Sequence, residues 1–81
     1  MSKQRLIISY TQVPEFVRMQ NVTYDRMSLI FSRCFLRIFL KDVMATGPDF
    51  LDSEFDAVTL HKADFLEPKI EYFTLSRIII Y

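Results

Sequence analysis

The sequence predicts an α+β fold in which one long helix packs on a small, mostly antiparallel sheet of three strands, in the order β-α-β-β. Three observations favour this fold. Residues 24–45 contain no glycine or proline, and this run is too long for an ordinary strand. Gly47 and Pro48 follow it, and such a pair ends helices because proline cannot continue the hydrogen bonding. Segments rich in β-branched residues lie on both sides of the run.

The expected elements follow one another along the chain. Residues 4–13 are rich in β-branched side chains and predict the first strand. Residues 14–20 begin with a proline and predict a short extra helical turn. The long helix is expected at residues 23–45, and the second and third strands at residues 55–65 and 70–81. We find no internal repeat in the sequence.

The length and composition limit the class of protein. At 81 residues, we expect a single domain over residues 1–81. Such a chain buries only about 60–65% of its unfolded surface, and association with another chain commonly compensates for this. Cys34 is the only cysteine and His61 the only histidine, which excludes an internal disulfide and the usual zinc sites. A lone thiol without an export signal predicts an intracellular protein, cytoplasmic by default.

The predicted helix is apolar over most of its circumference. At about 100° per residue, its cations form one narrow stripe of Arg26, Arg33, Arg37 and Lys41. The apolar arc is about 240° wide, whereas a one-sided surface helix needs about 100°. A three-stranded sheet cannot cover such an arc, and an exposed apolar patch usually marks an interface. The candidate interface residues are Met27, Leu29, Cys34, Leu36, Ile38 and Leu40.

An alternative interpretation makes residues 31–41 a strand. One face would then carry Phe31, Arg33, Phe35, Arg37, Phe39 and Lys41, and the other face Ser32, Cys34, Leu36, Ile38 and Leu40. An aromatic and basic sheet face is a surface on which single-stranded nucleic acid stacks. The length of the run and its leucine, methionine, arginine and lysine content favour the helix instead.

The net charge of zero conceals an asymmetry between the two halves of the chain. Residues 1–41 contain seven cations against two acids, and residues 42–81 contain three cations against eight acids. The two halves meet either within one fold or across two subunits. Across two subunits, the cationic stripe would contact an acidic group formed by Asp49, Asp52, Glu54 and Asp56.

No motif for catalysis, a cofactor or a metal stands out. The spacing of Asp49, Asp52 and Asp56 differs from that of a calcium-binding loop, and His61 lies near no nucleophile motif. We therefore predict a non-enzymatic protein–protein interaction module, of the adaptor, inhibitor or accessory type. It would use an apolar helix and strand surface to bind itself, as a homodimer, or a target protein. A nucleic-acid-binding protein that uses the cationic stripe is the alternative. The apolar run is too short and too charged for a membrane partner.

Overall fold

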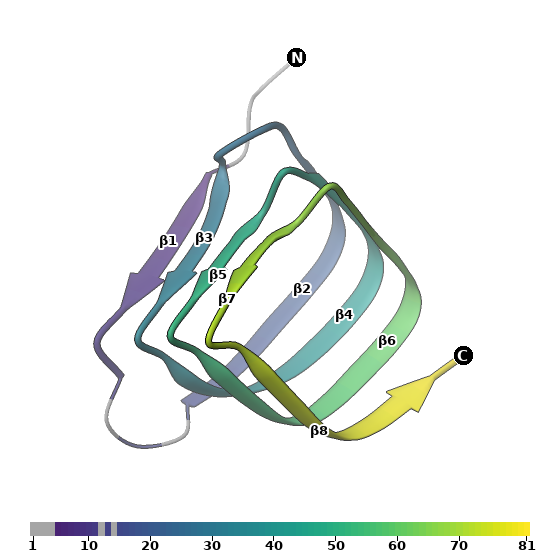
Figure 1. Cartoon of the computed structure of the whole chain (residues 1–81). Helices are drawn as coiled ribbons and strands as arrows, with labels where there is room; N and C mark the ends of the chain where they lie inside the picture. Colours follow the sequence, from purple (N-terminus) through teal and green to yellow (C-terminus); the bar gives the residue numbers. More distant parts are fainter. Residues whose placement is uncertain (1–4, 12, 14) are drawn as a thin grey trace.

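The chain forms two parallel β-sheets and no helix in the part that the structure, a computed structural model, describes (residues 5–11, 13 and 15–81; Figure 1). One sheet contains β1 (Leu6–Ser9), β3 (Leu29–Ser32), β5 (Asp49–Leu51) and β7 (Lys69–Glu71). The other sheet contains β2 (Glu15–Tyr24), β4 (Phe35–Thr46), β6 (Glu54–Leu66) and β8 (Thr74–Ile80). The expected α+β fold with a long helix is therefore wrong.

The strands alternate between the two sheets along the chain, so that the chain winds as a solenoid. Each coil passes through both sheets, and the next coil lies on top of it (Figure 1). Neighbouring coils are parallel and one strand spacing apart, about 4.8 Å. A solenoid buries apolar surface mainly between neighbouring coils, and each coil therefore depends on the next one.

A five-residue period sets the shape of each coil. The backbone φ is positive, between 50° and 63°, at every fifth residue of one series: Asp42, Gly47, Asp52, Ala57, Lys62, Glu67, Tyr72 and Arg77. We call these positions corners, because the chain turns there from one face of the coil to the next. Four corners close a coil of 20 residues, and the register agrees with this: Ile38 pairs with Val58, and Val58 pairs with Ile78.

The coils enclose a core of stacked side chains. The same inward position is filled in successive coils, which gives columns of apolar residues parallel to the solenoid axis. Phe31 and Phe50 are paired in register, and their rings stack with centroids 5.8 Å apart. The stack continues to Phe73, whose ring centroid lies 4.7 Å from that of Phe50. The buried apolar residues are Met19, Tyr24, Leu29, Phe31, Cys34, Leu36, Ile38, Leu40, Val43, Ala45, Phe50, Phe55 and Val58.

The predicted helix at residues 23–45 is wrong because its apolar pattern belongs to two strands. Leu36, Ile38 and Leu40 point into the core from β4, while the side chains between them lie on the outer face. The alternative strand interpretation thus describes residues 35–41 correctly. It fails at Phe31, which is buried in β3, because the chain turns at Arg33 (φ 55°) before β4 begins.

The other predicted elements are corrected in a similar way. Residues 15–20 are part of β2 rather than a helical turn, and Pro14 lies outside the described residues. The expected strands at 4–13, 55–65 and 70–81 overlap β1, β6, β7 and β8, but all pairings are parallel rather than antiparallel. Gly47 does adopt a left-handed φ of 60°, yet it ends a strand and not a helix. The expectation of no internal repeat is also wrong, because the corners recur every five residues.

Leu36→Ala should lower the free energy of unfolding by about 2–5 kcal/mol, because it leaves a cavity in the centre of a column. Met44→Ala is the control: Met44 is 46% exposed on β4, so a change within about 0.5 kcal/mol is expected. Urea denaturation followed by circular dichroism measures both variants. Equal losses in the two variants would contradict the assignment of inward and outward positions.

Candidate functional site

Exposed apolar side chains gather on the last coil, residues 68–81, where the core columns end. In one column Phe31 and Phe50 are 1% and 2% exposed, whereas Ile70 is 60% exposed. The columns that end at Leu75 and Ile78 behave in the same way: their members in the two preceding coils are at most 3% exposed, while these two residues are 45% and 44% exposed. The exposure therefore comes from the position in the solenoid and not from the residue type.

The same end of the solenoid presents free strand edges. β7 and β8 are the edge strands of their sheets at this end, as β1 and β2 are at the opposite end. β8 pairs with β6 only as far as Leu60, so residues 63–66 of β6 form a third edge (Figure 1). A strand edge offers backbone N–H and C=O groups to another strand. We call the last coil together with this third edge the open end.

An apolar cavity of about 130 Å³ lies beneath the last coil. Its walls come from the last coil and the two coils below it, and include Ile38, Phe50, Phe65, Ile70 and Phe73. Phe65 and Phe73 are only partly buried. The core is thus incompletely filled where no further coil covers it.

The opposite end of the solenoid is better covered. Met19 and Tyr24, in the first coil, are 8% and 6% exposed. The Tyr24 hydroxyl lies 3.2 Å from the Met19 sulfur, and burial raises the pKa of this hydroxyl. Val17 and Val22 of the same coil are partly buried against the core. We call the first coil the covered end, because its inward side chains are buried or partly buried, although β1 and β2 are edge strands there.

The apolar residues expected at an interface lie mostly in the core. Four of them are at most 2% exposed: Leu29, Leu36, Ile38 and Leu40. Cys34 is 3% exposed, and its thiol donates to the Ile8 carbonyl over 3.0 Å; burial raises the pKa of the thiol. Met27 alone among the six is exposed, at a residue with positive φ. The exposed apolar surface of this fold is formed by other residues.

The four cations of the expected stripe lie at the end of the first coil and in the second coil. Arg26 pairs with Glu67 over 3.2 Å. Arg33, at which the chain turns before β4, donates to the Tyr10 hydroxyl over 3.0 Å and lies over its ring. Arg37 and Lys41 are on the outer face of β4. The expectation of one narrow stripe is therefore wrong, since these side chains do not form one line.

The acidic residues expected at the interface are divided between three places. Asp49 is in β5, Asp52 is a corner, and Glu54 and Asp56 are in β6. No group of three or more potential metal ligands occurs in the described ranges. The basic and acidic halves of the sequence meet within one fold, because the basic β3 and β4 region stacks directly on β5 and β6.

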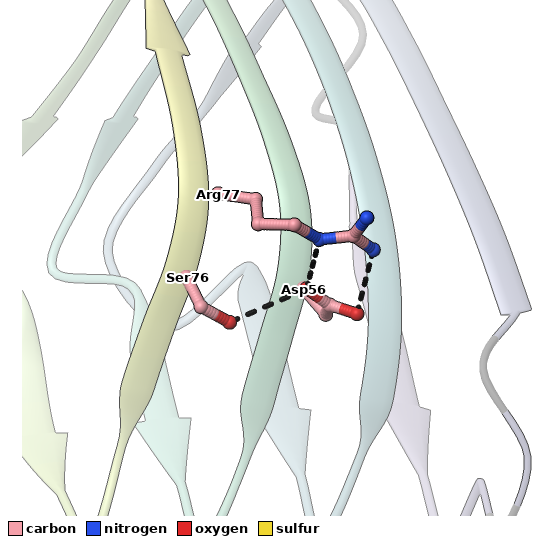
Figure 2. A network of polar contacts seen from close by, with 3 residues as sticks. All are labelled: Asp56, Ser76 and Arg77. Atoms are coloured by element: carbon pink, nitrogen blue, oxygen red, sulfur yellow. Dashed lines mark hydrogen bonds and ion pairs between the residues drawn. The ribbon is translucent and has the colours of Figure 1, made fainter.

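Asp56 forms an ion pair that fastens the last coil to the coil beneath it (Figure 2). Arg77 donates to both carboxylate oxygens of Asp56 over 2.8 Å, and the Ser76 hydroxyl donates to the same carboxylate over 3.3 Å. The hydrogen bonds from Arg77 hold the pKa of the Asp56 carboxyl below its ordinary value. The pair fixes the position of the corner at Arg77 on the open end.

Comparison with known proteins adds no relative: no protein-family model, curated protein or solved structure matches the chain. Within residues 5–11, 13 and 15–81 no helix is long and apolar enough to cross a membrane.

A signal for the coils was present in the sequence. Every fifth residue of one series is apolar: Phe50, Phe55, Leu60, Phe65, Ile70, Leu75 and Ile80. These residues are the inward positions of successive faces. A search at periods of two and 3.6 residues cannot detect this series, because five is a multiple of neither.

Asp56→Asn should destabilise the protein near neutral pH and have no effect in acid. The pKa of Asp56 is lower in the folded state than in the unfolded chain, so the ion pair stabilises the fold above the unfolded value, near pH 4. This contribution is lost as the pH falls through the lower, folded value. Thermal unfolding between about pH 3 and pH 7 measures the difference from the wild type. Arg77→Gln should show the same pH dependence, and a difference that stays constant with pH would contradict the assignment.

Proposed function

We propose that the protein is a non-enzymatic protein–protein interaction module that binds a second copy of itself through the open end. One observation carries the proposal: inward side chains that are at most 3% exposed within the solenoid become 44–60% exposed at Ile70, Leu75 and Ile78. In the lower coils, the equivalent positions are covered by the coil that follows. A second copy, whose exposed positions have the same spacing, can supply the same contacts.

The physical case for association has two parts. Covering a half-exposed isoleucine or leucine contributes about 1 kcal/mol, so Ile70, Leu75, Ile78 and Ile80 offer about 4 kcal/mol per copy. Strand edges that pair across the interface add backbone hydrogen bonds, each with a net contribution of about 0.5–1.5 kcal/mol. Both contributions come from the same surface, and the terminal coil of a solenoid is where its stacked core meets the solvent.

Chemistry at this surface favours protein contact over catalysis. The cavity beneath the last coil has no polar surface in its walls. A substrate site needs a few polar groups that orient the ligand next to the apolar walls. Apolar walls beside free strand edges are instead the features that strand addition from another protein uses.

Light scattering on a sizing column should give a mass near twice 9.7 kDa at micromolar concentration. Ile70→Asp should yield a monomer, because it places a charge on the open end. Ile7→Asp is the matched control: Ile7 is 52% exposed on β1 at the covered end, close to the 60% of Ile70, and its substitution should leave the dimer intact. Circular dichroism confirms that both variants are folded. A monomeric wild type, or equal effects of the two substitutions, would contradict the proposal.

A further inference from the structure

The open end has the shape of a spiral ramp. Each coil climbs by one strand spacing, so the end rises along the chain from the free edge at residues 63–66, through β7, to the second half of β8. The corner at Tyr72 lies in the middle of this ramp, with two faces before it and two after it. Tyr72 is 80% exposed.

One two-fold axis makes this ramp complementary to itself. The axis runs perpendicular to the solenoid through the corner at Tyr72, and it places the low half of one ramp against the high half of the other. The gap between facing edges then stays constant around all four faces. A two-fold axis through any other corner or face would leave a gap larger by one strand spacing, about 4.8 Å, over part of the end.

This axis determines which strand edges meet. β7 of one copy faces the first half of β8 of the other, and the second half of β8 faces the free edge of β6 at residues 63–66. The facing strands run antiparallel, because the axis reverses the direction of the chain. Both copies use the same surface, so the assembly closes as a dimer.

The head-to-tail arrangement is less favourable. It would place the open end of one copy on the covered end of another, where Met19 and Tyr24 are already buried. The charges also do not attract: the last coil carries Lys69 and Arg77 against Glu71, and the first coil, at residues 5–27, also has one excess cation. The acids are concentrated instead in the coil beneath the last one, residues 48–67, which has one cation and six acids.

The two-fold arrangement brings opposite charges together at two symmetric corners. The axis exchanges the corners at residues 67 and 77, so that Arg77 lies over Glu67 of the partner subunit. Arg77 is held in place by Asp56, and Glu67 by Arg26. The four side chains then alternate in sign across the interface, and the like-charged corners remain apart.

We infer that two copies join through their open ends about a two-fold axis at Tyr72, with Arg77 of each copy against Glu67 of the partner subunit. The inference rests on the proposed function and specifies its geometry. It predicts antiparallel pairing of β7 with the first half of β8 across the interface.

Mixing two charge-reversed variants tests this geometry. Arg77→Glu and Glu67→Arg should each dimerise about ten-fold more weakly than the wild type, because each homodimer contains two like-charged contacts. A one-to-one mixture should recover nearly the wild-type affinity, because both contacts of the mixed dimer are of opposite charge. Each variant keeps its own internal changes in the mixture, so recovery comes only from contact between residues 67 and 77 of different copies. Analytical ultracentrifugation with one variant labelled measures the mixed dimer.

The outcomes separate the inference from the proposed function. Recovery in the mixture supports the two-fold arrangement. A dimeric wild type whose variants do not recover on mixing overturns the arrangement and leaves self-association standing. A wild type that remains monomeric up to the highest soluble concentration overturns both.

Discussion

The stacking of apolar side chains between successive coils is the interaction on which the rest of this structure depends. Phe31, Phe50 and Ile70 occupy one position in three coils; Phe31 and Phe50 are covered by the coils that follow them, whereas Ile70 in the last coil is exposed. The same stacking holds the strands in parallel register, since a shift of one residue would turn inward side chains to the solvent. It also creates the open end, because a column that is buried from both sides in the middle must be exposed at its last member.

The shape of the coil follows from its corners. Seven of the eight corner residues between Asp42 and Arg77 are not glycine, although a left-handed φ costs a residue with a Cβ about 1–2 kcal/mol. The contacts of four faces per coil offset this cost, because each corner turns the next face toward the core. The short chain of 81 residues has little stability to spare, which makes the uncovered columns of the last coil significant for the whole fold.

The sequence allowed some of this to be predicted. In the sequence, Leu36, Ile38 and Leu40 alternate with aromatic and basic residues. This alternation describes β4, in which the three apolar residues point inward and the residues between them point outward. The apolar width of this segment was attributed to a helix buried nearly all round, because the run of residues 24–45 is too long for an ordinary strand; the structure divides the run among β2, β3 and β4, and β4 buries one face. The open end could not be placed, since exposure at Ile70 depends on coil stacking that neither helical nor two-residue periodicity reveals.

Hydrogen exchange measured over a range of protein concentrations tests the central claim most directly, that the open end is covered by a second copy. The amides of β7 and β8 that point away from β5 and β6 should exchange more slowly as the concentration rises, while those of β4, already paired on both sides, should not change. Exchange of the β7 and β8 amides that is fast and independent of concentration would contradict the account.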